Sequence, residues 1–166
     1  MPSRKILKYP DPLLAQKSSP VTQFDQHLKK LVADMFDTMY AAEGIGLAAP
    51  QIGILQRIVT IDLEEEADPL VLINPEIKSA SGRIDSEEGC LSIPGFRESI
   101  KRQAEIEVCA QNIKGEVFSF SADQLLARCV QHEIDHLDGI LFIDHLSRLK
   151  RQFFNRWLKK RGPFEE

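Results

Sequence analysis

The sequence predicts an α+β fold, with antiparallel-rich β-sheets around a central helix, a helix near the N-terminus and another at the C-terminus. Two observations support it. Apolar residues recur at helical spacing in the first and last thirds, whereas the middle has β-branched runs and apolar–polar alternation typical of strands. This segregation favours α+β over a parallel α/β sheet. No repeat or linker interrupts the 166 residues, so we expect a single catalytic domain spanning 1–166.

The first third of the chain is expected to contain two helices. Asp11–Gln16 can form a short helix that stops at the Ser18-Ser19-Pro20 cluster. A longer amphipathic helix is expected over 24–43, since its apolar positions keep helical spacing: Leu28, Leu31, Val32, Met35 and Met39. The glycines of Gly44-Ile45-Gly46 then end this helix.

The middle of the chain is expected to form strands. Residues 57–63 and 70–74 are β-branched runs, and residues 106–110 alternate between apolar and polar side chains. Turns are expected at Ser81-Gly82 and Lys114-Gly115. These segments supply the antiparallel-rich sheets.

A second long helix is expected from about 122 to 138. Ser121 and Gln124 have the spacing of a capping box, and Gly139 is placed to close the other end. The motif His132-Glu133-Ile134-Asp135-His136 lies in its last turns. Four residues form the expected buried stripe: Leu125, Leu126, Cys129 and Val130. The motif should therefore lie inside the protein.

Composition restricts the class of protein. Hydrophobic residues make up 43% and charged residues 28%, as in soluble globular domains. A net charge of −4 and a pI near 5.6 give no reason to expect DNA as a partner. No apolar run approaches the ~18 residues of a membrane span, and the first residues do not resemble a signal peptide. Three cysteines without framework spacing favour a reducing compartment, so we expect a cytoplasmic protein. The acidic run 64–66 is expected to be a solvated loop.

The His-Glu motif carries the main functional signal. Histidines four residues apart project from nearly the same helix face and can grip one metal ion. Glu133 lies about 100° round the helix, where it can reach a water bound to that metal. The pattern therefore predicts metal-assisted hydrolysis. The alternative is a helix with two surface histidines.

The third metal ligand separates the enzyme classes. An extended zinc-protease motif needs histidine where Phe142 stands, and residues 146–164 contain no acid that could act instead. A deaminase needs a Pro-Cys-x-x-Cys pair, which is absent. Among the cysteines, Cys129 lies about 10 Å along the helix axis from His136, and Cys109 lies on an acidic strand face. The pattern favours Cys90, which we expect in a loop where Gly89 allows close approach.

The segment 44–51 is rich in small residues. It lacks the Gly-Lys-Ser/Thr ending of a phosphate loop. Small side chains instead suit an extended chain lying alongside, although a helix stop and a tight bend would also explain them. Gln51 at its end is a neutral amide donor that could face an oxyanion.

Three segments resemble the three signature motifs of the peptide deformylases, in order and separation. They are 44–51 (Gly-Ile-Gly-Leu-Ala-Ala-Pro-Gln), 88–92 (Glu-Gly-Cys-Leu-Ser) and 131–136 (Gln-His-Glu-Ile-Asp-His), and the opening 6–12 fits as well. The resemblance covers essentially the whole chain. It implies removal of the N-formyl group from the initiator methionine of nascent polypeptides, with release of formate.

The resemblance also implies the role of each residue. Cys90, His132 and His136 would bind one divalent ion, typically Fe²⁺, for which Zn²⁺, Ni²⁺ or Co²⁺ can substitute. Glu133 would be the general acid/base, while the Gln51 side chain and the Leu91 N–H would stabilise the oxyanion.

The same resemblance implies how the formyl-methionyl peptide binds. Its backbone would pair with Ile45 and Gly46, and its methionine side chain would enter an apolar pocket. Residues implied at or near that pocket are Leu125, Cys129, Glu88, Gly89 and Arg97. Leu125 and Cys129 would equally suit a plain helix core.

The last expected helix, 147–160, is basic and ends at Gly162-Pro163. It carries Leu149, Phe153 and Trp157 at spacing four. A solvated basic face explains its charges; the sharper hypothesis is a weak contact with ribosomal RNA. His27 and His145 are both expected to be solvated.

Two alternatives remain open at this point. A small zinc endopeptidase would share the His-Glu-x-x-His motif, although the downstream ligand is missing. A non-catalytic protein with a structural metal would leave Glu133 and Gln51 without a role, and structural sites normally have four protein ligands.

Overall fold

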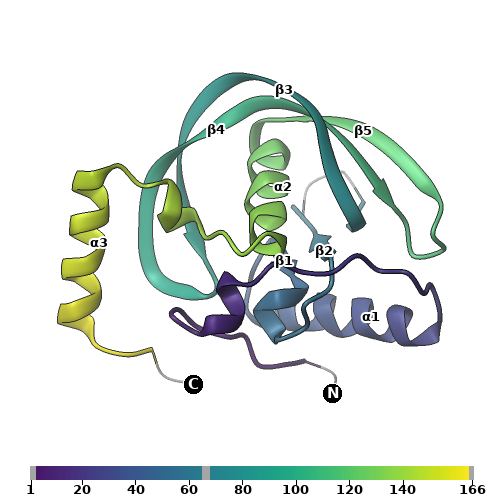
Figure 1. Cartoon of the computed structure of the whole chain (residues 1–166), viewed down its shortest axis with the longest axis horizontal. Coiled ribbons are helices and arrows are strands. Elements are labelled where there is room, and N and C mark those ends of the chain that lie inside the picture. The colour runs from purple at the N-terminus through teal and green to yellow at the C-terminus, as the bar shows by residue number, and fades with distance from the viewer. Residues whose placement is uncertain (1–2, 65–67, 165–166) are drawn as a thin grey trace.

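The computed structural model describes residues 3–64 and 68–164, so most of the predicted acidic loop at 64–66 lies outside the described residues. Within these ranges the elements are a five-stranded antiparallel sheet and three α-helices, which confirms the α+β prediction. Helix α2 stands in the middle of the molecule, enclosed by the curved sheet (Figure 1). No helix in the described part is both long and apolar enough to cross a membrane.

The sheet is a meander whose strands pair in chain order. Its strands are β1 (Gly46–Ala48), β2 (Ile58–Ile61), β3 (Leu70–Cys90), β4 (Ile93–Gln111) and β5 (Val117–Asp123), and every neighbouring pair is antiparallel. Three predicted strand regions thus correspond to β2, β3 and β4. The turn predicted at Lys114-Gly115 is confirmed between β4 and β5, where the Gly115 N–H donates to the carbonyl oxygen of Asn112.

Strand β3 is much longer than predicted. The segment 70–74 is only its beginning, and the turn predicted at Ser81-Gly82 is wrong, because Ser81 pairs with Glu105 inside the sheet. The reason is burial. Residues 76–83 are all exposed, so no apolar alternation marks them as strand. Gly82 has φ +70°, but the strand register continues through it from Ser81 to Arg83, so the chain does not reverse there.

Helix α1 (Gln26–Ala41) begins where the Asp25 side chain accepts a hydrogen bond from the Leu28 N–H. The predicted helix over 24–43 is therefore confirmed to within two residues at each end. The short helix predicted at Asp11–Gln16 is a 3-10 helix, Pro12–Ala15.

Helix α2 (Gln124–Leu137) carries the His-Glu motif as predicted, but its predicted capping box is wrong. Ser121 belongs to β5, where it pairs with Glu107 and its hydroxyl donates to the Glu107 carboxylate. The N-cap position is Asp123, without a side-chain cap. Ser121 is therefore part of the sheet, although its spacing from Gln124 had predicted it to cap the helix.

Two helices pack on opposite faces of β1 and β2. Val59 and Ile61 pack in a cluster with α2, whereas Ile58 packs in a cluster with α1. This follows from the alternation of side chains along a strand, and it explains why all four residues of β2 are buried. Of the predicted stripe on α2, Cys129 and Val130 are buried, while Leu125 and Leu126 are half-buried.

Helix α3 (Arg148–Arg161) lies at one end of the molecule, beyond the β3–β4 hairpin (Figure 1). Its fully buried contact is Phe154, which packs against Phe96 of β4. Leu149 and Phe153 are 60% and 47% exposed. Trp157 is half-buried and packs against Phe96 and Phe154, so only one of the three apolar residues at spacing four belongs to the face that packs on the protein.

Candidate metal centre and cleft

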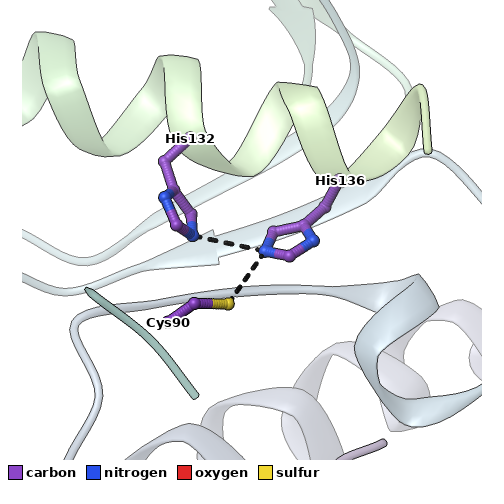
Figure 2. Close-up of side chains that lie close together, drawn as sticks. All are labelled: Cys90, His132 and His136. Carbon is purple, nitrogen blue, oxygen red and sulfur yellow. Dashed lines mark hydrogen bonds between the residues drawn. The ribbon is translucent and has the colours of Figure 1, made fainter. Parts of the chain in front are cut away.

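The three predicted ligands converge from two elements. His132 and His136 lie one turn apart on α2, and Cys90 ends β3 (Figure 2). The Cys90 Sγ lies 3.4 Å from the His136 Nε2, which lies 3.2 Å from the His132 Nε2. All three donor atoms lie within 4.8 Å of one another.

This donor set fits a metal ion. A tetrahedral ion with ligands at about 2.1 Å (N) and 2.3 Å (S) would hold those atoms about 3.3 to 3.6 Å apart, which is close to the separations of the His136 Nε2 from the Cys90 Sγ and from the His132 Nε2. Hydrogen bonds alone do not satisfy the cluster, because the His136 Nε2 faces both a sulfur and a ring nitrogen and carries at most one proton. In addition, the buried Glu133 Oε1 has no hydrogen-bond partner.

Cys90 lies at the tip of a hairpin and not in an open loop, so that part of the prediction is wrong. It is the last residue of β3, and only Leu91 and Ser92 separate it from β4. The Ser92 N–H points at the Cys90 Sγ over 3.4 Å. The tight turn thereby fixes the thiol relative to α2.

Glu88 orients one of the histidines. Its Oε1 lies 2.9 Å from the His132 Nδ1, which leaves the His132 Nε2 directed at the cluster. Arg102 donates to both oxygens of Glu88, at 2.8 and 2.9 Å. Burial alone raises the pKa of Glu88, but these hydrogen bonds outweigh it and lower that pKa to about 2. Glu88 is therefore an ionised carboxylate that accepts a hydrogen bond from His132 on the side of the ring away from the cluster.

The same network extends to the protein surface. Arg102 also donates to the Asp135 Oδ2 over 2.6 Å, and the His145 Nε2 lies 2.8 Å from that oxygen. His145 is exposed, as expected, and it also contacts the Asp135 carboxylate. His27 is exposed, as expected.

Glu133 is buried so close to the backbone of residue 46 that only glycine fits there. A Cβ on Gly46 would lie 2.6 Å from the Glu133 Oε2 and 2.9 Å from the Cys129 Sγ. Burial raises the pKa of Glu133 to about 7 and, with the Glu133 and Glu88 charges, raises the pKa of the Cys129 thiol. Cys129 thus remains a neutral, small side chain beside the cluster.

Gln51 is buried with its amide group turned toward the cluster. Its Oε1 accepts from the Ala48 N–H over 3.0 Å. Its Nε2 donates to the Ser92 Oγ over 3.1 Å and lies 3.7 Å from the Cys90 Sγ. The amide donor therefore faces the place where the ligands converge.

A cleft of about 730 Å³ leads to this cluster. All seven residues predicted for substrate binding line it: Ile45, Gly46, Glu88, Gly89, Arg97, Leu125 and Cys129. Cys90, Leu91, His132, Glu133 and Gln51 line it as well. The structure thus brings the predicted residues to one cleft, with His136 buried behind its lining.

Sequence reasoning missed three residues at this site. Arg102 lies on a strand and Ser92 follows the predicted ligand, and no local pattern links either of them to the histidines. Arg128 also lines the cleft. It lies four residues before His132 on the same helix, so helical spacing could have found it.

The fold and the site define a protein with a Cys-His-His cluster and a buried carboxylate at a cleft. Residues 3–152 match the family described as Polypeptide deformylase. A peptide deformylase of Acidobacterium capsulatum is 53% identical over 160 residues, covering 95% of this chain and 94% of that protein. One of Neisseria gonorrhoeae is 50% identical, covering 94% of each.

Solved structures agree. The peptide deformylase of Legionella pneumophila is 45% identical with a TM-score of 0.89, covering 97% of this chain and 99% of that one. That of Synechococcus elongatus in complex with actinonin is 42% identical with a TM-score of 0.91, covering 98% and 89%. The chain therefore belongs to the polypeptide deformylase family and is an enzyme of that family.

Proposed function

We propose that this cleft is where the enzyme removes the N-formyl group from the methionine of nascent peptides and releases formate. One observation carries the assignment. Three donor atoms of the kind that bind transition metals converge within 4.8 Å beside a buried carboxylate whose Oε1 has no partner. The activity is assigned to one catalytic domain spanning 1–166.

Cys90, His132 and His136 are the proposed ligands of one divalent ion. Such an ion supplies Lewis-acid chemistry, by polarising the formyl oxygen and lowering the pKa of a water. Thiolate and imidazole donors accept Fe²⁺, Zn²⁺, Ni²⁺ and Co²⁺, and the family resemblance favours Fe²⁺. Glu88 and Arg102 hold the His132 ring so that its Nε2 would be free to bind the ion.

Glu133 is the proposed proton carrier. Its carboxylate takes a proton from the attacking water as oxygen adds to the formyl carbon, and returns it to the methionine nitrogen as the C–N bond breaks. The products are formate and a free amino terminus. The Gln51 Nε2 and the Leu91 N–H are the proposed donors to the oxyanion, since both belong to segments next to Cys90.

The peptide is proposed to bind as an added strand beside Ile45 and Gly46. Both residues line the cleft, and Gly46 leaves room at Glu133 and Cys129 that a side chain would fill. The methionine side chain enters between Leu125 and Cys129. Gly89 and Arg97 border the same cleft from the β3–β4 hairpin.

One assay separates this function from its alternatives. Metal-loaded protein prepared without oxygen is incubated with formyl-Met-Ala-Ser and with unformylated Met-Ala-Ser. Formate from the first and no cleavage of the second is the expected result. Glu133→Ala should retain the metal and lose activity by about 10²- to 10⁴-fold. Cleavage of internal bonds would favour a zinc endopeptidase, and metal binding without any hydrolysis would favour a structural metal site.

The cytoplasm is the proposed location, since an oxidisable thiol at the metal suits a reducing compartment. The ribosome is the proposed further partner, through helix α3, whose outer side is basic. Truncation after Ser147 would remove Phe154 from the core, so charge substitutions at Arg148, Arg156 and Lys160 are the better test. These should abolish salt-sensitive co-sedimentation with ribosomes; unchanged co-sedimentation would contradict the contact.

A further inference from the structure

The cleft contains one basic side chain that has neither an ion pair nor a hydrogen bond among the described residues. Three basic side chains outside the metal site line it: Lys8, Arg97 and Arg128. Arg97 forms an ion pair with Glu87 at 2.8 Å, and the Lys8 ammonium donates to the Ile6 carbonyl oxygen. Arg128, which is half-buried, has no ion pair, hydrogen bond or ring contact among the described residues. Its guanidinium is therefore available to a ligand in the cleft.

The position of Arg128 on α2 indicates which part of a ligand it meets. Leu125, Arg128, Cys129 and His132 follow one another at spacings of three, one and three, so they share one side of the helix, and all line the cleft. Arg128 precedes His132 by four residues, which is about 6 Å along the axis. It therefore borders the proposed methionine pocket on the side away from the metal.

In an extended peptide bound with its methionine in the proposed pocket, the third residue would lie near Arg128. Side chains alternate along a strand, so the third side chain points to the same side as the methionine, about 6.6 Å further on. The second side chain points away from α2. Two other charged side chains outside the metal site line the described cleft without an ion pair: Lys8, whose ammonium donates to the Ile6 carbonyl oxygen, and Glu43, which is exposed and lies three residues before Gly46. Neither of them belongs to α2, the helix that carries Arg128.

We infer that Arg128 is a specificity-determining residue that favours formyl-methionyl peptides with Asp or Glu as the third residue. This inference rests on the proposed function, because it assumes that the methionine lies between Leu125 and Cys129. A partly exposed ion pair is weak, so we expect a preference of about two- to fivefold in kcat/KM for glutamate over its neutral isostere glutamine. Lysine at the third position should be disfavoured to a similar extent.

The test uses metal-loaded enzyme and peptides with an amidated C-terminus, so that no terminal carboxylate competes for Arg128. Formyl-Met-Ala-Glu-Ala-amide, formyl-Met-Ala-Gln-Ala-amide and formyl-Met-Ala-Lys-Ala-amide are compared by formate release. The same three side chains are then placed at the second position, where we expect no preference. High salt should remove the third-position preference, because it screens exposed charges.

Three variants assign the effect. Arg128→Gln should remove the preference, Arg128→Glu should reverse it toward lysine, and Arg83→Gln, an exposed arginine on β3 with the same change in net charge, should keep it. Equal kcat/KM for the three peptides in the unmodified enzyme would overturn the inference, as would a preference that persists in Arg128→Gln. In both results the neutral peptide is still deformylated and the proposed function stands. No formate from any peptide would overturn both.

Discussion

Gln51 is held at both ends of its side-chain amide. The Ala48 N–H donates to its Oε1, and its Nε2 donates to the Ser92 Oγ. Both Gln51 and Ser92 are almost completely buried, so water cannot replace a lost partner. The hydrogen bond to Ser92 fixes the direction in which the Gln51 amide nitrogen points.

We therefore expect Ser92 to be a positioning residue for Gln51, the proposed oxyanion donor. Ser92→Ala should lower kcat about 10-fold with little change in KM, since the Gln51 Nε2 loses its anchor but not its donor capacity. Stability should fall by about 1–3 kcal/mol, the cost of a buried group left unpaired. Formate-release kinetics and urea unfolding measure the two effects, with exposed Ser119→Ala as control. An unchanged kcat together with the stability loss would show a purely structural role.

Arg102 is the other residue on which the site geometry depends. It is buried and donates to two carboxylates, Glu88 and Asp135. Arg102→Leu leaves Glu88 buried without its counter-charge, which should destabilise the fold by about 3–5 kcal/mol and weaken metal binding by about 10- to 100-fold. Competition with a chelator and urea unfolding test both effects. Lys101→Leu, the exposed neighbour, should change neither. Unaltered metal affinity in a folded Arg102→Leu protein would contradict this account of His132 orientation.

At the level of elements, the N-terminal segment is fastened to α1 by charge. Asp34 is buried on α1 and pairs with Arg4 at 2.8 Å, while the Arg4 N–H donates to the Thr38 hydroxyl. The hydrogen bond from Arg4 lowers the pKa of Asp34 below its ordinary value of 3.8, and Lys30 adds to this effect. Ionised Asp34 therefore stabilises the folded state.

This contribution depends on pH in a defined direction. Because the folded-state pKa is lower than the unfolded one, the stabilisation is complete above pH 3.8 and is lost as the pH falls through the folded-state value. Asp34→Asn should therefore be less stable than the unmodified protein at pH 7, and the difference should shrink below pH 3.8. Urea unfolding at both pH values measures it, with Asp37→Asn on the same helix as control. A difference that is independent of pH would contradict the ion-pair explanation.

Helices could be predicted from the sequence more fully than strands, for a physical reason. α1 and α2 each bury one side, so apolar spacing marks them, and α1 also has a capping residue, Asp25. The outer part of β3 is exposed on both faces and is held by hydrogen bonds to β4, which leave no trace in side-chain pattern. The capping box at Ser121 was wrong for the same reason, since pairing across the sheet is not local.

The site residues also divide into those fixed by local sequence and those brought together by strand pairing. The histidines and Glu133 could be predicted because four residues of one helix fix their relation. Placing Cys90 required elimination of other ligands and then resemblance, because the β3–β4 hairpin that brings it to α2 spans strands that the pattern did not reveal. Arg102 lies fourteen residues from Glu88 in sequence, and only the pairing of β3 with β4 brings the two side chains within hydrogen-bonding distance, so local pattern could not predict this contact.

In the whole molecule, separate apolar clusters meet at the turn between β3 and β4, beside Cys90. Leu91 packs against the cluster of α1, and Cys90 packs against the cluster that contains Phe154 of α3. The N-terminal segment adds backbone hydrogen bonds to this region, from the Leu7 N–H to the Gln51 carbonyl oxygen and from the Tyr9 N–H to the Ser92 carbonyl oxygen. The turn is thus supported from several sides by segments distant in sequence.

Phe154 is the fully buried side chain of helix α3, so it should contribute most of that helix's stabilisation and should affect activity only indirectly. Phe154 is fully buried, with its ring 4.8 Å from that of Phe96, a residue that lines the cleft, and 5.6 Å from that of Tyr9. Phe154→Ala should cost about 3–5 kcal/mol and should raise KM as Phe96 loses support. Its neighbour Phe153 is 47% exposed, so Phe153→Ala should change stability by less than about 0.5 kcal/mol.

Urea unfolding of both variants compares two identical substitutions at adjacent positions, so helix propensity cancels and burial alone differs. Equal destabilisation by Phe153→Ala and Phe154→Ala would contradict the conclusion that α3 packs on the protein through Phe154. A large loss at Phe154 with an unchanged KM would instead separate the α3 cluster from the cleft. The expected pair of results, a large stability loss and a raised KM at Phe154 only, would join the end of the chain to the site through Phe96.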